Sequence, residues 1–293
     1  MSINSWIKKN TRSLVGKTVA ISGATGGIGR QLCLYLAELG ASLVLINRNE
    51  ERAKKLGEEI LSLFPNTKIE NITADMEDID SVRRAADKLL EMPIDILYLN
   101  AGAYAIPRHK CSTGYDNVFE INFISPYFLA KTLLPSIRER GGKIVAVGSI
   151  AHRYSTTDPS DMDFSTRSGA SVAYGNSKRY LMCALPALAE KEGEVVIVHP
   201  GITFTNITAH YPKFIFAIIK HPMKVVFMSV KKATLSILAG AFWSTGGESW
   251  IGPRIFDVWG LPKIKKINIP KAESKQIIAD SEMIYKSISS KVV

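Results

Sequence analysis

Short runs of Val, Ile and Leu alternate with amphipathic segments through most of the 293-residue chain. The runs are continuously apolar, which is typical of parallel strands covered on both faces. The segments between them repeat their apolar residues with the period of a helix. The expected strands are Thr18–Ser22, Leu43–Ile46, Ile69–Thr73, Ile94–Leu99, Ile144–Val147 and Val195–Val198. This alternation predicts an α/β fold with a doubly wound parallel sheet and helices on both of its faces.

No internal repeat or linker interrupts the alternation. We therefore expect a single domain over residues 13–288, preceded by an N-terminal extension over residues 1–12. The three cysteines are far apart and form no Cys-x-x-Cys pair, which is typical of a reducing compartment. The N-terminus lacks the apolar region of a signal peptide, and we find no uncharged apolar run long enough to span a membrane. These features predict a cytoplasmic protein.

The net charge of +10 is concentrated in the C-terminal third, where residues 201–293 contain 13 Lys and Arg against 5 Asp and Glu. The chain has no zinc-finger spacing, no aromatic RNA-binding motif and no low-complexity basic tail, so we expect no nucleic-acid partner. The five histidines show no metal-ligand spacing, so we expect no metal site. Contact with an anionic membrane surface stays open for this basic and apolar third.

A glycine-rich segment, residues 22–29, directly follows the first expected strand and opens a helical segment. Glycines reach positive φ and let a pyrophosphate approach the backbone, while the helix N-terminus offers N–H groups and positive dipole. No Gly-Lys-Ser/Thr follows, which excludes a P-loop. The context of strand, loop and helix predicts dinucleotide binding. The residues expected in contact with the dinucleotide are Gly23, Thr25, Gly26, Gly27, Ile28 and Gly29.

The end of the second strand indicates which dinucleotide binds. An enzyme that prefers NAD places Asp or Glu about twenty residues after the loop. This strand ends at Asn47 and Arg48, with no acid, and an Arg can form bidentate hydrogen bonds with a 2′-phosphate. We therefore predict that NADP(H) is preferred over NAD(H). The alternative is an Arg48 that is simply solvated.

Further cofactor contacts are expected after the next two strands. Asp75 and Met76 follow the third strand, and Asn100, Ala101 and Gly102 follow the fourth. Ligands bind at the carboxyl ends of parallel strands in this architecture. We expect Asp75 to accept a hydrogen bond from the adenine amine, and the small residues to lie against the adenosine.

Tyr174 and Lys178 are four residues apart in a helical segment and therefore share a face. A phenol with its ordinary pKa of about 10 exchanges protons poorly at neutral pH, and a fixed ammonium nearby lowers that pKa. The pair therefore predicts that Tyr174 is a general acid/base. Such a pair occurs often by chance, but here Ser149 follows the fifth strand, and Pro200 and Gly201 follow the sixth.

Together these motifs resemble the short-chain dehydrogenase/reductase family. The family's glycine motif matches residues 22–29, with Ser22 at its Thr position, and its Asn-Ala-Gly matches residues 100–102. Its remaining motifs match Asn122, Ser149, Tyr174 with Lys178, and Pro200 to Thr205. The segment 148–152 and the acidic loop 161–164 are similar to the retinol dehydrogenase-like and protochlorophyllide reductase-like branch. The resemblance implies a Rossmann-type fold.

The resemblance also implies roles. NADPH would deliver hydride to a carbonyl carbon while Tyr174 protonates the oxygen and Ser149 hydrogen-bonds it. Lys178 would hold the nicotinamide ribose and lower the pKa of Tyr174. Asn122 would hold a water that relays protons toward Lys178. The expected nicotinamide contacts are Pro200, Gly201, Ile202 and Thr205.

The resemblance further implies that residues 203–245 form a substrate lid, which as an apolar wall would suit a bulky hydrophobic carbonyl or alcohol. Core packing and peripheral membrane contact are the alternatives for this apolar segment. Family members are often dimers or tetramers, so a homodimer or homotetramer is expected, with a monomer as the alternative if the protein associates with a membrane. A non-catalytic dinucleotide-binding regulator is the alternative to an enzyme. Against it stands the complete set Asn122, Ser149, Tyr174 and Lys178, which a regulator does not need.

Overall fold

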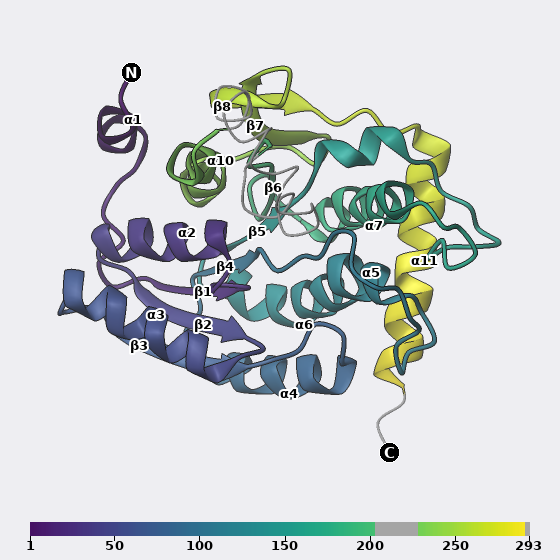
Figure 1. The fold of residues 1–293 in the computed structure, drawn as a ribbon, viewed down its shortest axis with the longest axis horizontal. Coiled ribbons are helices and arrows are strands. Elements are labelled where there is room, and N and C mark those ends of the chain that lie inside the picture. The colour runs from purple at the N-terminus through teal and green to yellow at the C-terminus, as the bar shows by residue number, and fades with distance from the viewer. Residues whose placement is uncertain (203–227, 291–293) are drawn as a thin grey trace, which may run out of the picture.

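Eight strands form one sheet in the order β3-β2-β1-β4-β5-β6-β7-β8 in the computed structural model, which describes residues 1–202 and 228–290 (Figure 1). Neighbouring strands pair in parallel through β7, and β8 pairs with β7 in the antiparallel direction. The strands are β1 (Thr18–Ser22), β2 (Ser42–Asn47), β3 (Ile69–Thr73), β4 (Ile96–Leu99), β5 (Lys143–Val147), β6 (Val195–Val198), β7 (Ser249–Ile255) and β8 (Trp259–Lys266). The doubly wound α/β fold is confirmed.

The six expected strands are all present, and β7 and β8 complete the sheet. Strand β4 begins two residues later than expected. Asp95, just before it, uses its side chain to hold the start of β1. Its carboxylate accepts hydrogen bonds from Lys17 Nζ and from the Thr18 backbone, both at 2.9 Å.

Helices cover both faces of the sheet (Figure 1). The α-helices are α1 (Ile3–Asn10), α2 (Gly27–Glu38), α3 (Glu50–Leu63), α4 (Ile79–Leu90), α5 (Asn117–Phe119), α6 (Ser125–Glu139), α7 (Ala170–Ala184), α10 (Val230–Phe242) and α11 (Lys271–Ser289). Shorter segments are the π-helix η1 (Glu120–Ile124) and the 3-10 helices η2 (Ile150–Tyr154) and η3 (Pro186–Leu188).

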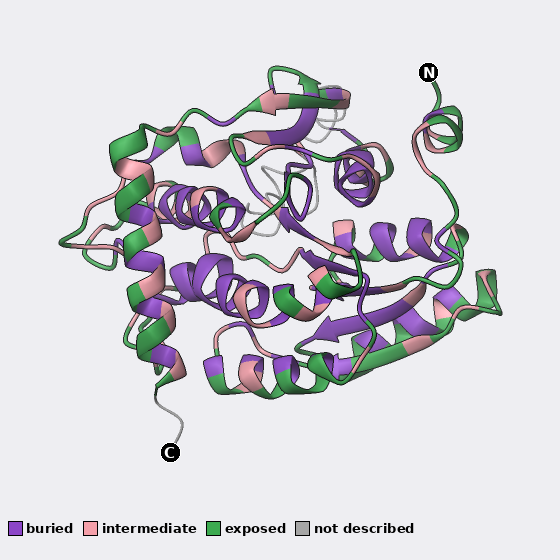
Figure 2. Cartoon of the chain, turned by 180° about the vertical axis from the view of Figure 1, so that it is seen from behind, coloured by how far each residue is buried: buried purple, intermediate pink, exposed green. Residues whose placement is uncertain are grey.

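The sheet divides the core into two apolar clusters. One cluster joins α4, α6, α7 and α11 to one face, and the other joins α1, α2, α3 and α10 to the opposite face. Figure 2 shows the strands and the inward stripes of the helices buried between these layers. Within residues 1–202 and 228–290, no helix combines the length and the apolar character needed to cross a bilayer.

Helix α10 lies within the segment 203–245 that was predicted to be a substrate lid. Nine of its residues are buried, and it packs against the sheet and α2. This part of the segment is therefore core, because Leu235, Ile237 and Leu238 belong to the apolar cluster beneath the sheet. The larger part of the predicted lid, residues 203–227, lies outside the described residues.

The order of the strands reverses between β1 and β4, which pair directly with each other although β2 and β3 separate them in the sequence. In open α/β sheets the crevice at such a reversal, at the carboxyl ends of the strands, is where ligands bind. The predicted glycine loop follows β1, and the Asn-Ala-Gly segment follows β4. The fold therefore brings both predicted cofactor motifs to this crevice.

Candidate active site

The glycine loop is shaped by contacts that exclude a Cβ atom. Gly23 has a φ of +65°, and a Cβ there would lie 2.8 Å from the Cα of Ala101. A Cβ on Gly29 would lie 2.2 Å from the carbonyl oxygen of Gly23. Gly26 is the N-cap of α2, and no side chain within residues 1–202 and 228–290 caps this helix N-terminus. The loop thus presents bare backbone at a helix N-terminus, which is the arrangement that binds a phosphate.

Neutral hydrogen bonds hold this loop against β4. The Oγ of Ser22 accepts from the backbone N–H groups of Asn100 at 3.0 Å and Ala101 at 3.1 Å. Asn100 Nδ2 donates to the carbonyl oxygens of Ser22 at 3.0 Å and Gly23 at 3.1 Å. The crevice is therefore preformed by side chains at the ends of β1 and β4, each of which hydrogen-bonds to backbone atoms at the end of the other strand.

Asn47 and Arg48 lie at the end of β2, as the prediction requires. Asn47 is buried; its Oδ1 accepts from the Thr25 backbone at 3.0 Å, and its Nδ2 has no partner within the described part of the chain. The Arg48 side chain is 70% exposed, and its Nη1 lies 3.8 Å from Asp75 Oδ2 and 3.9 Å from Glu77 Oε1. These separations exceed a hydrogen bond, so the guanidinium donors of Arg48 stay accessible to a ligand.

Asp75 and Met76 lie in a turn after β3 that is fixed by its own hydrogen bonds. Asp75 Oδ1 accepts from the Glu77 backbone at 3.1 Å, and Ser125 Oγ donates to the carbonyl oxygen of Met76 at 2.8 Å. The orphaned Nδ2 of Asn47, the accessible Arg48 and the loop that excludes Cβ atoms together fit a dinucleotide. Contact of each residue with that group remains a prediction.

Lys178 reaches the crevice from α7 and is almost fully buried, with its Nζ donating to the Val147 carbonyl at 2.8 Å. A Cβ on Gly102 would lie 2.9 Å from Asn122 Oδ1 and 3.5 Å from Lys178 Nζ. Gly102 therefore leaves the space in which these two polar groups approach each other. Burial lowers the pKa of Lys178 to about 7, because a buried ammonium loses its hydration.

Tyr174 is one helical turn from Lys178 on α7, and the structure pairs it with Ser149. Burial raises the pKa of Tyr174, and a hydrogen bond with the Ser149 side chain partly offsets this. Lys178 Nζ lies 5.8 Å from the centre of the Tyr174 ring, over its face. That Lys178 lowers the pKa of Tyr174 stays a prediction, and the largest influence on the Tyr174 pKa in this structure is burial. The Lys178 ammonium is itself disfavoured by burial and is directed to a carbonyl oxygen.

Asn122 lies in η1, the π-helical turn between α5 and α6. Its Oδ1 accepts from the Ala103 backbone at 3.2 Å, and its Nδ2 donates to the carbonyl oxygens of Ala103 at 2.8 Å and Val118 at 2.9 Å. The side chain thus fixes the segment after β4 beside Lys178. A water relay through Asn122 remains a prediction.

The segment after β6 contains three of the predicted nicotinamide contacts. Pro200 and Gly201 follow β6, and Gly201 has a φ of +84° with a would-be Cβ only 2.6 Å from the Val258 carbonyl. Ile202 donates from its backbone to that same carbonyl at 3.4 Å. Thr205 lies outside the described residues.

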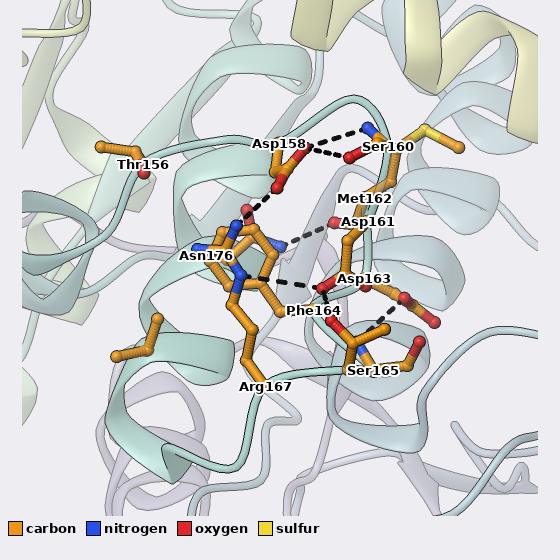
Figure 3. Close-up of polar contacts among 12 residues, drawn as sticks. Thr156, Asp158, Ser160, Asp161, Met162, Asp163, Phe164, Ser165, Arg167 and Asn176 are labelled. Carbon is orange, nitrogen blue, oxygen red and sulfur yellow. Dashed lines mark hydrogen bonds and ion pairs between the residues drawn. The ribbon is translucent and has the colours of Figure 1, made fainter.

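The acidic loop beside α7 is held together by its own side chains (Figure 3). Asp158 Oδ2 pairs with Arg167 Nη2 at 2.5 Å, and Asp158 Oδ1 accepts from Ser160. Asn176, between Tyr174 and Lys178 on α7, donates to the Met162 carbonyl at 2.7 Å. The loop is therefore tied to the helix that carries the candidate catalytic pair.

Two residues that the sequence did not single out complete the surroundings of this pair. The ring of Tyr104 meets the Tyr174 ring edge-on at 5.2 Å, and its hydroxyl lies 3.0 Å from Ser171 Oγ. His152 is buried and donates from Nδ1 to the Ser149 carbonyl at 2.7 Å. The sequence signal for His152 was its position three residues after Ser149, because in a helical turn a side chain can hydrogen-bond to the carbonyl three residues earlier. Tyr104 offered no comparable signal.

Behind Ser149 the structure forms an aromatic stack. Trp250 packs edge-on against His152 and flat against His199, with ring centres 5.4 Å and 5.1 Å apart. Burial lowers the pKa of His199 to about 4, so this ring is neutral at physiological pH. Among the described residues, no three His, Cys, Asp or Glu side chains converge on a position for a metal.

Comparison with known proteins gives consistent results. The model of the family described as short chain dehydrogenase matches residues 17–214. The chain is 33% identical to short-chain dehydrogenase TIC 32 A, chloroplastic, of Brassica napus over 66% of both proteins. It is 29% identical to retinol dehydrogenase 13 of Homo sapiens, over 68% of this chain and 62% of the relative. The matches thus span about two thirds of the length of these relatives.

Among solved structures, an uncharacterized protein from Mycobacterium paratuberculosis is similar in fold. Its TM-score is 0.72 at 23% identity, and the alignment covers 95% of this chain and 96% of that structure.

Proposed function

The chain belongs to the short-chain dehydrogenase/reductase family, and on this premise we propose that it is an NADP(H)-dependent oxidoreductase acting on a carbonyl or alcohol group. The observation that carries the proposal is the placement of Lys178 Nζ, which lies 5.8 Å from the centre of the Tyr174 ring and beside Gly102, at the crevice that the glycine loop borders. Relatives in this family include enzymes named as dehydrogenases.

Tyr174 is the proton donor in this proposal. Because burial raises its pKa, the phenol is protonated at neutral pH and can give its proton to an oxygen on which negative charge develops. Ser149 Oγ, fixed by an N–H···O bond from Ala151 at 3.2 Å, hydrogen-bonds the same oxygen. These protonation states suit reduction of a carbonyl.

A bound nicotinamide dinucleotide supplies the hydride for this reduction or accepts it in the reverse direction. The N-terminus of α2 and the loop around Gly23 and Gly26 would hold its pyrophosphate. Lys178 and the crevice at Gly102 would hold the nicotinamide ribose. Arg48 would bind a 2′-phosphate and so favour NADPH, because its donors are accessible at the end of β2.

The proposed substrate is bulky and hydrophobic. The name of the human relative, retinol dehydrogenase 13, supports an apolar substrate. The aromatic edge that Tyr104 presents to Tyr174 supports an apolar wall at the site of reaction.

Assembly into a homodimer or homotetramer is also proposed. Such an assembly would have to avoid the outer surface of α6 and α7, because α11 of the same chain packs on both helices (Figure 1).

Tyr174→Phe tests the chemistry. We expect turnover of NADPH with bulky aldehydes and ketones to fall about a thousandfold, while NADPH affinity stays the same, because only the transferable proton is lost. Absorbance loss of NADPH gives the rate, and fluorescence titration gives the affinity. Tyr104→Phe, in the same site, is the matched control and should keep turnover within a few-fold. Tight NADPH binding without turnover of any carbonyl by the wild type would favour the dinucleotide-binding regulator instead.

Arg48→Asp tests the cofactor preference. We expect the ratio of NADH to NADPH dissociation constants to fall at least about tenfold, because a charge-assisted bidentate contact is replaced by repulsion. Lys88→Asp, an exposed charge reversal in the last turn of α4, is the control and should leave the ratio unchanged. Equal affinities of the wild type for both cofactors would contradict the preference.

A further inference from the structure

The hairpin formed by β7 and β8 carries an unusual concentration of exposed apolar side chains. The described residues include eleven large apolar side chains that are exposed, and four of them lie in this hairpin: Ile255, Phe256, Trp259 and Ile264. Phe256, at the tip, is 86% exposed, the highest value among the eleven. Ile255 and Trp259 lie directly opposite each other in the register beside the tip. Three of the four apolar side chains therefore gather at the tip of the hairpin, and Ile264 lies further along β8, opposite Ile251.

The backbone of the tip is held in a conformation that Phe256 does not favour. Phe256 and Asp257 have φ values of 48° and 59°, and the Val258 N–H donates to the Ile255 carbonyl at 3.0 Å. Two consecutive left-handed residues form the tight hairpin turn in which Asn and Gly are preferred. A large apolar side chain at this position is strained and points into solvent. Strain of this kind is found where it serves a function.

The exposed charges on strands β7 and β8 are all basic, although the exposed Glu248 directly precedes β7. Arg254, Lys263 and Lys266 are exposed on the two strands. The acid of the hairpin, Asp257, is 4% exposed and is neutralised by Arg153 at 2.9 Å and Lys265 at 2.6 Å. The apolar tip is thus flanked by a positive surface.

The beginning of α10 extends this positive surface. Its first turn contains Lys231 and Lys232 and no acid, although a helix N-terminus disfavours cations. Lys232 Nζ lies 3.6 Å from the centre of the Trp259 ring, which joins this turn to the apolar tip. Lys231 and Lys232 therefore add to the positive surface beside the hairpin, although the dipole of α10 disfavours cations at this end.

Strand β8 is the edge of the sheet, but it is poorly suited to pairing with a strand of another protein. Pro262 interrupts its row of donors, and Lys263 and Lys266 flank the edge, features that oppose strand addition. An apolar wedge that includes a Trp and is surrounded by lysines fits the interface of a bilayer with anionic headgroups. We propose that the β7–β8 hairpin docks this protein on an anionic membrane surface. Phe256, Ile255 and Trp259 enter the boundary between headgroups and acyl chains.

The test uses the full chain and vesicles of phosphatidylcholine with or without phosphatidylserine. We expect the wild type to co-sediment with the anionic vesicles and to be released by salt. Phe256→Gly is the decisive variant, because glycine relieves the left-handed strain: its midpoint of unfolding should stay or rise while vesicle partition falls about tenfold. Leu63→Ser, an exposed apolar position at the end of α3, is the matched control and should bind as the wild type does.

Charge and insertion are tested separately. Lys263→Glu with Lys266→Glu should reduce partition at least about tenfold, and Lys54→Glu with Lys55→Glu on α3 should reduce it much less. Lipids brominated in the upper acyl chain should quench the fluorescence of the wild type but not of Trp259→Phe, since Trp6 and Trp250 are buried and Trp243, at the end of α10, is half-buried.

Three outcomes overturn the proposal. The first is no binding of the wild type to anionic vesicles. The second is binding that Phe256→Gly and the Lys263 and Lys266 reversals leave unchanged. The third is a wild type that forms a dimer and does not bind vesicles, together with a Phe256→Gly variant that is monomeric. That result would assign the tip to contact with a second copy of the chain. The inference does not depend on the proposed reaction, because sedimentation and quenching need no turnover.

Discussion

The two sides of the crevice are stabilised by different interactions. On the glycine-loop side, glycine sterics and neutral side chains do the positioning: Ser22, Asn47 and Asn100 all hydrogen-bond to backbone atoms. On the side of Ser149 and Tyr174, charged pairs between distant segments do it. Arg179 on α7 forms a bidentate pair with Glu273 on α11, and Arg153 on η2 pairs with Asp257 on the β7–β8 hairpin.

The difference shows how each side meets its task. The glycine loop must leave its backbone N–H groups accessible to a ligand. Glycines, and Asn side chains that hydrogen-bond only to backbone atoms of the protein, meet this requirement. The other side must fix α7 and η2, whose residues bear the reacting groups. Arg179 links the two by donating to the His152 carbonyl at 2.8 Å, and His152 in turn binds the Ser149 carbonyl. Charged groups on α11 therefore reach the candidate catalytic serine through two intermediates.

The largest effect is expected from adding one carbon to the glycine-loop side. Gly29→Ala should lower the free energy of unfolding by about 3 kcal/mol, because the new Cβ would lie 2.2 Å from the Gly23 carbonyl oxygen. Urea unfolding measures this, and NADPH affinity should fall in parallel. In the control Gly246→Ala, no heavy atom lies within 4 Å of the added Cβ. If Gly29→Ala were instead stabilising, as helix propensity alone predicts, the steric account of this side would be wrong.

A smaller effect is expected from the charged side. Glu273→Gln should cost about 2 kcal/mol of unfolding free energy, because it leaves the buried guanidinium of Arg179 without its counter-charge. The same measurement on Glu190→Gln provides the control, since Glu190 is 67% exposed in its pair with Arg138 and should change stability by less than about 0.5 kcal/mol. Equal effects of the two substitutions would remove the distinction between the sides.

The smallest effect concerns Lys178, where the two sides meet. Its pKa in the folded protein is about 7, below the ordinary 10.5, so between these values the unfolded chain binds one more proton. Stability must then increase with pH in this range, by about 1 kcal/mol from pH 7 to pH 8. From pH 7 to pH 8, the unfolding free energy of the wild type should therefore rise by that amount relative to the unfolding free energy of Lys178→Met. A difference that stays constant would show that the Lys178 ammonium is not destabilised by burial.

The sequence predicted the glycine-loop side better than the charged side. Glycine spacing, the residues after β4 and the apolar strands are patterns of residue type along a short stretch. Strands β7 and β8 escaped prediction because Gly252, Pro253, Gly260 and Pro262, with three lysines, break any apolar run there. Those strands exist because of their pairing with each other and with β6.

The candidate catalytic residues were predicted through their spacing, but their electrostatics were not. The separation of Tyr174 and Lys178 indicated a shared helix face, which the structure contains. It could not show that burial raises one pKa and lowers the other. Nor could it show that Arg179 meets Glu273, because residue type does not select partners so far apart. Helix α10 was assigned to a lid for a related reason: its apolar character fits either a lid or a core.

Helix α11 has a consequence for the synthesis of the protein on the ribosome. Tyr180 Oη donates to Asp280 at 2.8 Å, Tyr127 Oη to Glu282 at 2.7 Å, and Arg83 Nη2 to the Ile288 carbonyl at 2.6 Å. These partners are 100, 155 and 205 residues apart in the chain. The growing polypeptide therefore cannot cover the apolar surface of α6 and α7 until α11 has emerged. During that interval the nascent chain exposes a surface that chaperones recognise, and its dependence on them should end only when residue 289 leaves the exit tunnel.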